Sequence, residues 1–134
     1  MKHNLNFEML SLNVRGIRSF EKRKALFQWL VQQGADVIFL QETYNTPEVE
    51  HIWKSQWKGD MFFGHGTVHS RGVLVLVKEN LDCESKVCKQ DKQGRFIILK
   101  GLIWCRDIRL FSLICTLQIT SMNNVSIMRK FKRK

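Results

Sequence analysis

One carboxylate, Glu42, lies just beyond a short apolar run. Residues 35–40 read Ala-Asp-Val-Ile-Phe-Leu, and Gln41, Glu42 and Thr43 come next. A short apolar run that follows Gly34 and ends in polar residues is typical of a strand buried on both faces. Glu42 would then lie at the carboxyl end of that strand, where open α/β sheets form their ligand crevices. A carboxylate in this place is either a solvated loop residue or a metal ligand, and spacing alone leaves both interpretations open.

A glycine-rich segment at 64–72 contains three further polar candidates. His65 and His69 are four residues apart, a spacing that could share one helix face, but the glycines in this window indicate a loop. We therefore favour surface histidines over a metal site or a general base. Arg71, in the same loop, is better suited to hold a phosphate, because a guanidinium can donate two hydrogen bonds to it.

The elements before Glu42 predict how these residues are positioned. Apolar residues in 7–14 indicate a strand that ends at Asn13, and Ser19 is a good N-cap for the helix that follows. Gly34 is the expected helix stop, so residues 6–42 form one strand–helix–strand unit. Since such units have parallel strands, Asn13 and Glu42 should lie at the same edge of the sheet.

The elements after Glu42 change character along the chain. A second helix should begin at Thr46 and Pro47, with Val49, Ile52 and Trp53 on its apolar face. Only strands are expected beyond it: 60–63, 73–77, 81–90, 95–104 and 108–114. This helix-free run argues against a doubly wound, flavodoxin-like binding domain, although that fold would share the first unit.

Bulk composition limits the class of protein. The chain has 134 residues, the length of one domain, and 44% of them are hydrophobic, which suits a globular protein. No apolar run approaches the roughly 18–20 residues of a membrane span, and the first residues lack the apolar core of a signal peptide. The four cysteines form no CxxC pair, so we expect reduced thiols, no zinc site and an intracellular protein, nuclear if it is functional. The sequence leaves the oligomeric state open.

Positive charge is concentrated at the end of the chain. The formal net charge is +10, all 12 acidic residues lie at or before Asp107, and residues 129–134 read Arg-Lys-Phe-Lys-Arg-Lys. Such a tail either binds nucleic acid without sequence preference or is simply solvated.

Several ordered segments resemble the endonuclease/exonuclease/phosphatase superfamily, and most closely the endonuclease domains of LINE-type retrotransposons. The segments are Ser-Leu-Asn-Val-Arg-Gly-Ile at 11–17, the helix at 21–30, Ala-Asp-Val-Ile-Phe-Leu-Gln-Glu-Thr at 35–43, Trp-Lys-Ser at 53–55, His-Gly-Thr at 65–67, Ser-Arg-Gly-Val at 70–73 and Gly-Arg-Phe at 94–96. The resemblance covers about residues 7–111. It implies an α/β fold of the DNase I-like type, a two-sheet α/β sandwich, and a DNA partner with no membrane role.

The resemblance also implies roles for two residues. Asn13 matches the family's active-site asparagine near metal and phosphate, and Glu42 matches its magnesium-binding glutamate. The implied function is a Mg²⁺-dependent (or Mn²⁺-dependent) phosphodiesterase that acts as a DNA endonuclease. The chemistry agrees, because Mg²⁺ typically takes one or two carboxylates, with waters and phosphate oxygens completing its octahedron.

The sequence departs from the family after Phe111. Tyr-Ala-Pro, Gly-Asp-Phe-Asn and a final Ser-Asp-His are expected there, and none occurs. We therefore expect residues 1–114 to be the N-terminal part of a truncated sandwich, incomplete and inactive, and residues 115–134 to be an unrelated basic tail. A shifted reading frame before Cys115 would produce such a tail. The alternative is a non-catalytic truncated product or a weak basic nucleic-acid-binding protein.

Overall fold

The computed structural model of the chain describes residues 8–79, 83–90, 92, 94, 96–105, 108–118 and 126–128. The side chains that it describes are those of residues 8–79, 92 and 94. Its elements, in chain order, are β1 (Met9–Asn13), α1 (Phe20–Gln33), β2 (Val37–Gln41), the 3₁₀ helix η1 (Pro47–Val49), α2 (Glu50–Lys54), β3 (Asp60–Gly64), β4 (Val73–Val77), β5 (Cys83–Gln90), β6 (Phe96–Cys105), β7 (Ile108–Gln118) and β8 (Ser126–Met128).

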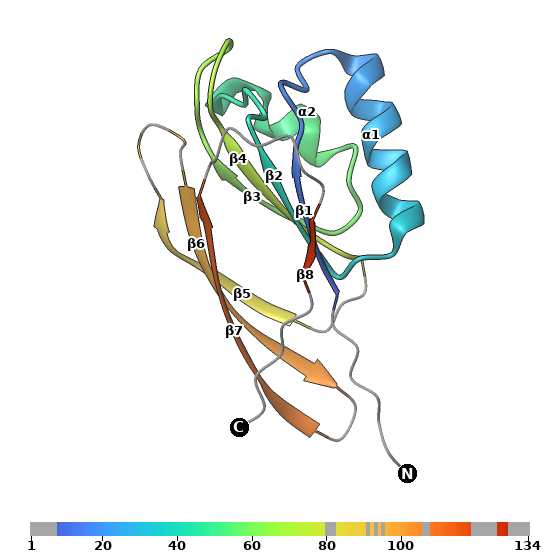
Figure 1. The fold of residues 1–134 in the computed structure, drawn as a ribbon, viewed down its shortest axis with the longest axis vertical. Coiled ribbons are helices and arrows are strands. Elements are labelled where there is room, and N and C mark those ends of the chain that lie inside the picture. The colour runs from blue at the N-terminus through green and yellow to red at the C-terminus, as the bar shows by residue number, and fades with distance from the viewer. Residues whose placement is uncertain are drawn as a thin grey trace.

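The strands form two sheets. The larger sheet has the order β3-β4-β2-β1-β8, and β5, β6 and β7 form an antiparallel second sheet. Figure 1 shows α1 and α2 on one side of the larger sheet and the second sheet beyond its opposite side. The predicted α/β class is confirmed, and this arrangement of two sheets and outer helices is part of the predicted sandwich.

β2 is the centre of the larger sheet. It pairs in parallel with β1 through the α1 crossover and antiparallel with β4. The antiparallel β4 rules out the doubly wound alternative, whose sheet is mostly parallel. All five residues of β2 and all five of β4 are buried, as the uninterrupted apolar run before Glu42 predicts for a strand covered on both faces.

α1 begins and ends where its terminal residues predict. The Ser19 hydroxyl accepts a hydrogen bond from the backbone of Lys22, and Gly34 adopts the left-handed conformation that closes the helix. Phe27 and Leu30 are buried on the inner face of α1, in one core cluster with Ile38 of β2. The strand–helix–strand unit is therefore present as expected.

The second helix differs from its prediction. Thr46 makes no side-chain capping bond, because its hydroxyl instead accepts a hydrogen bond from Arg18 Nη1 at 2.9 Å. The chain passes through η1 before α2, and α2 has only five residues. Trp53 is buried as expected, but the side chain of Ile52 is 45% exposed, so its assignment to the apolar face is wrong.

The strands β3 to β7 lie close to their predicted ranges, whereas the sequence predicts no strand at β8 (Ser126–Met128), which lies within the expected basic tail. β3 ends one residue later than expected, β5 starts two residues later, and β7 extends through Gln118. β8 pairs antiparallel with β1. The described helices contain none with the length and apolar character needed to cross a bilayer.

Candidate active site

Asn13 and Glu42 lie at the same edge of the larger sheet. Asn13 is the last residue of β1 and is paired with Gln41, the last residue of β2, so Glu42 is one residue beyond that pair. Asn13 is buried, whereas the side chain of Glu42 is partly exposed. The Asn13 side-chain oxygen accepts a hydrogen bond from the backbone N–H of Arg15 at 3.1 Å, which turns the chain away from the strand.

Hydrogen bonds hold the segment that contains Glu42 on both sides. On one side, the N–H of Gly16 donates to the Glu42 carbonyl (2.5 Å) and that of Ile17 to the Thr43 carbonyl (3.1 Å). On the other side, the N–H groups of Thr43 and Tyr44 donate to the carbonyls of Gly72 (3.1 Å) and Arg71 (2.8 Å), respectively. The sheet pairing therefore continues past the ends of β1 and β4, and the backbone at Glu42 is fixed.

Left-handed backbone conformations gather at this edge. Among the residues that the structure describes, the non-glycine residues with positive φ are Arg15 (51°), Glu42 (54°), Tyr44 (61°) and Arg71 (62°). Such a conformation costs roughly 1–3 kcal/mol per residue and is common at functional sites. Sequence reasoning could not find it, because none of these residue types favours positive φ.

Two glycines allow the close approach of these segments. A Cβ on Gly16 would overlap the Tyr44 ring, and a Cβ on Gly72 would lie 2.8 Å from Thr43 Oγ1. Both glycines also have positive φ, 83° and 90°. The Tyr44 and Thr43 positions therefore depend on the absence of side chains at Gly16 and Gly72.

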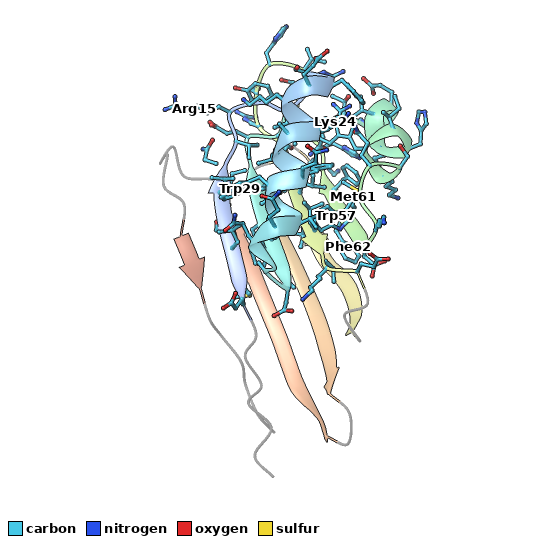
Figure 2. The ribbon with its side chains drawn as sticks, turned by 90° about the vertical axis from the view of Figure 1, so that its right-hand side faces the viewer. Arg15, Lys24, Trp29, Trp57, Met61 and Phe62 are labelled. Carbon is cyan, nitrogen blue, oxygen red and sulfur yellow. The ribbon has the colours of Figure 1, made fainter. Side chains whose placement is uncertain are left out.

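Basic side chains surround this edge. Arg15 and Arg71 are exposed, and Figure 2 shows Arg15 projecting away from the body of the protein. Lys22 Nζ donates to the Val14 carbonyl at 2.9 Å, and Arg18 Nη1 donates to the Tyr44 carbonyl at 3.0 Å. The structure places Arg71 beside the segment that contains Glu42, because the Arg71 carbonyl accepts a hydrogen bond from the Tyr44 N–H, whereas Asn13 lies on the other side of that segment, at the end of β1.

A polar network not predicted from the sequence supports the segment from behind. Asn45 is fully buried, and its amide nitrogen donates to Thr43 Oγ1 (2.5 Å) and to the Val73 carbonyl (3.1 Å). Because the amide nitrogen faces these two acceptors, the Asn45 side-chain oxygen faces His65 Nδ1, 2.8 Å away. An amide oxygen can only accept a hydrogen bond, so His65 Nδ1 must carry the hydrogen. His65 Nε2 lies 2.6 Å from the carboxylate of Glu50.

His65 therefore differs from its sequence-based interpretation, whereas His69 is exposed as expected. The His65 ring stacks on Phe63, with the ring centroids 5.9 Å apart. It links the loop after β3 to both the Glu42 segment and α2. The partners Asn45 and Glu50 come from other parts of the fold, so spacing within the 64–72 loop carried no signal of them.

The side chains present suit a magnesium ion with few protein ligands. Asn13 and Glu42 offer only oxygen donors and a single carboxylate, which is the donor set Mg²⁺ prefers over softer metals. Within the described part of the chain, no group of three histidine, cysteine, aspartate or glutamate side chains could hold a metal. Water and substrate oxygens would have to complete the coordination.

The fold and this edge of the sheet define a class of protein. Residues 10–107 match the Endonuclease/Exonuclease/phosphatase family, so the chain belongs to that family. It is also 37% identical, over 90 residues, to the transposon TX1 uncharacterized 149 kDa protein of Xenopus laevis, in a match that spans 67% of this chain and 7% of that protein. The family and the relation to a transposon protein confirm the resemblance seen in the sequence.

Solved structures show the same fold at low sequence identity. An AP endonuclease from Leishmania major, LMAP, aligns with a TM-score of 0.57 and 18% identity over 84% of this chain and 40% of that one. The endonuclease domain of TRAS1, a telomere-specific non-LTR retrotransposon, aligns with a TM-score of 0.53 and 13% identity over 87% of this chain and 46% of that one. D. rerio TDP2 complexed with a single-strand DNA product aligns with a TM-score of 0.54 and 19% identity over 88% of this chain and 48% of that one. The chain thus spans less than half of each of these structures.

Proposed function

We propose that this chain is the N-terminal part of a magnesium-dependent phosphodiesterase domain of the DNA-endonuclease type found in retrotransposon-like elements. The observation that carries the proposal is the meeting of Asn13 and Glu42 at one sheet edge, among exposed arginines. Membership of the family and the relation to a transposon protein support it. DNA is the proposed substrate, and no membrane partner is involved.

Each residue of the site has a proposed task. Glu42 is the carboxylate ligand of Mg²⁺ or Mn²⁺, and its fixed backbone limits the positions that the carboxylate can take. Asn13 is also a candidate ligand, and its amide can orient a phosphate without adding charge. Arg71 is the proposed phosphate contact, and Arg15 adds positive charge nearby. When bound, the ion would supply Lewis-acid stabilisation of charge on the phosphate and on the leaving oxygen.

Catalysis needs further groups that this sequence does not contain. Hydrolysis requires a group that positions and deprotonates the attacking water, and the resemblance assigns that role to motifs that do not occur in these 134 residues. We therefore propose that residues 1–114 form only part of the catalytic machinery. Residues 115–134 are proposed to be unrelated to the family, as a reading-frame shift before Cys115 would explain.

Metal binding tests the proposal directly. In a calorimetric titration with Mn²⁺, the chain should bind weakly, since one carboxylate and one amide make a poor cage. Glu42→Ala should abolish the binding heat and Asn13→Ala should reduce it. Glu79→Ala is a matched control, because Glu79 is an exposed carboxylate far along the chain from both ligands. Equal Mn²⁺ binding by the wild type and Glu42→Ala would show that Glu42 is not a ligand.

A second candidate function, weak non-catalytic binding of nucleic acid, is favoured by the basic residues at 129–134. This function predicts an affinity for DNA that falls steeply with salt and does not depend on sequence. Removal of residues 129–134 should then weaken binding, while Glu42→Ala should not. DNA affinity that is unchanged without the tail would exclude this candidate.

A further inference from the structure

An apolar groove runs along the outer flank of α1, and none of its lining residues belongs to the candidate active site. Its volume is about 700 Å³, and it lies between α1, the segment that leads into β3 and the residues that follow β4. The contributing residues are Phe20, Lys24, Phe27, Gln28, Leu30, Val31, Gly34, Ala35, Gln56, Trp57, Lys58, Gly59, Lys78 and Glu79. In Figure 2, Lys24 and Trp57 lie on the same flank of α1, while Trp29 lies on the other.

The apolar part of the groove is open at two positions on α1. Val31 is 67% exposed and Phe20 is 53% exposed, whereas Phe27 and Trp57 beneath them are buried. An exposed phenylalanine and an exposed valine therefore leave apolar surface in contact with water near both ends of this helix flank. Burial of such surface is the usual driving force of protein association.

The rim of the groove is positively charged. Lys24, Lys58 and Lys78 are all exposed, and among the described residues that line the groove Glu79 is the one acidic residue. Lys78 has an ion-pair partner, Asp36, only at 4.0 Å, so its charge is little compensated. An occupant that carries carboxylates beside its apolar face would match this surface.

We propose that this groove docks an amphipathic helix of a partner protein, one with an apolar face flanked by aspartate or glutamate. α1 has 14 residues and is therefore about 21 Å long, which suits a partner helix of three to four turns. The basic segment at 129–134 of this chain has the wrong charge to occupy the groove.

Nucleic acid fits the groove less well than a helix does. Base stacking needs the open face of an aromatic ring, and the rings in the groove floor, Phe27 and Trp57, are 3% and 8% exposed. Phe20 is 53% exposed, but the guanidinium of Arg23 lies over its ring, 6.0 Å from the centroid, so the groove offers one partly covered ring and no series of stacking surfaces. The rings of these two residues pack on each other edge to face, with centroids 5.8 Å apart. The exposed aliphatic Val31 offers apolar contact without a stacking surface.

Two designed helical peptides test the proposal on the full chain. Both carry the same leucine face and a fluorescent label; one has glutamates beside that face and the other has lysines. Fluorescence anisotropy should show binding of the glutamate peptide that weakens as salt increases, and no binding of the lysine peptide. Equal affinity for the two peptides, or no binding of either, would overturn the proposal.

Substitutions locate the binding to the groove. Val31→Glu and Lys24→Glu should each weaken binding of the glutamate peptide roughly tenfold, since one removes the most exposed apolar contact and the other reverses a rim charge. The matched controls are Val68→Glu and Lys92→Glu, which place a carboxylate at exposed positions outside the groove and should leave the affinity unchanged. Circular dichroism checks that each variant is folded. If Val31→Glu does not fold, Lys24→Glu still tests the groove, because it changes an exposed charged residue.

Competition separates the two kinds of partner. An unlabelled single-stranded oligonucleotide should not displace the glutamate peptide from the groove. Displacement that is lost in Lys24→Glu would identify the groove as a nucleic-acid surface and overturn the proposal.

Discussion

Glu42 combines a proposed metal-binding role with an unfavourable backbone conformation. Its φ of 54° lies in the left-handed region, where a residue with a Cβ is disfavoured by about 1–2 kcal/mol. The hydrogen bonds on both sides of the segment maintain this conformation. Glycine would adopt this conformation without that cost, so the Glu42 side chain is present at a local cost in stability.

Two substitutions at Glu42 separate stability from metal binding. Both Glu42→Ala and Glu42→Gly should lose Mn²⁺ binding, but Glu42→Gly should be more stable than Glu42→Ala by about 1 kcal/mol, because only glycine relieves the strain. Denaturant unfolding measures the difference. Equal stability of the two variants would show that the backbone at Glu42 is not strained.

Gly72 is expected to be intolerant of any side chain. Gly72→Ala should lower the free energy of unfolding by roughly 1–3 kcal/mol, since it combines a strained φ with a Cβ that would lie 2.8 Å from Thr43 Oγ1. Gly34→Ala is the matched control: its φ is also positive, 70°, but its Cβ would meet nothing within 4 Å. Chemical denaturation should therefore show the smaller loss in Gly34→Ala, and a loss as large as that of Gly72→Ala would argue against the steric explanation.

At the scale of elements, a buried arginine joins α1 to its surroundings. Arg23 is 4% exposed, and it donates to Gln56 Oε1 (2.5 Å) and the Ile17 carbonyl (3.1 Å). Its guanidinium lies 5.1 Å from the centroid of the Trp53 ring. Burial, with a smaller contribution from Arg18, lowers the pKa of Arg23 below its ordinary value. The partners that the structure gives for this cation are neutral, so packing and hydrogen bonds must compensate its burial.

Arg23→Met should therefore destabilise the fold although it retains most of the side-chain volume. We expect a loss of about 1–3 kcal/mol, because the buried Ile17 carbonyl and Gln56 lose their donor. Lys24→Met, at the next and exposed position, should change stability by no more than about 0.5 kcal/mol. Thermal and urea unfolding of the two variants would test this, and an Arg23→Met protein as stable as wild type would show that the arginine hydrogen bonds add nothing.

The parts of the structure that the sequence predicts are those governed by local signals. Ser19 and Gly34 determine the ends of α1 within the residues beside them, and the apolar run before Glu42 predicts a strand buried on both faces. The common edge of Asn13 and Glu42 then follows from parallel strand pairing.

The parts that could not be predicted depend on residues far apart in the chain. The hydroxyl of Thr46 accepts a hydrogen bond from Arg18, 28 residues earlier, and makes no bond to the backbone of the second helix. His65 finds its partners Asn45 and Glu50 only after β3 and α2 have packed. The positive φ of Glu42 likewise arises from pairing with segments on both sides, not from its own residue type.

Taken as a whole, the chain spans only part of the solved structures that share its fold, 40% of LMAP and 46% of the TRAS1 endonuclease domain. We expect these 134 residues, incubated with supercoiled plasmid and Mg²⁺, to nick DNA no faster than a Glu42→Ala control. The sequence lacks the Tyr-Ala-Pro, Gly-Asp-Phe-Asn and Ser-Asp-His motifs, to which the family resemblance assigns the proton-transfer and positioning groups. Acid–base catalysis alone typically contributes 10²–10⁴-fold to the rate. Agarose-gel assays measure nicking, and robust activity that depends on Glu42 would mean that this part of the fold is sufficient.

The buried strand β4 has a consequence for the chain before it folds. Its sequence, Val-Leu-Val-Leu-Val, lies buried between β2 and β3, but in the newly made chain it is an uncharged apolar segment prone to aggregation. Arg71 precedes it by two residues and Lys78 follows it at once, so each end carries a charge that opposes stacking of identical strands. We therefore expect that replacing Arg71, the arginine proposed to contact a phosphate, by a neutral residue would reduce the yield of refolded protein even where the folded state is equally stable.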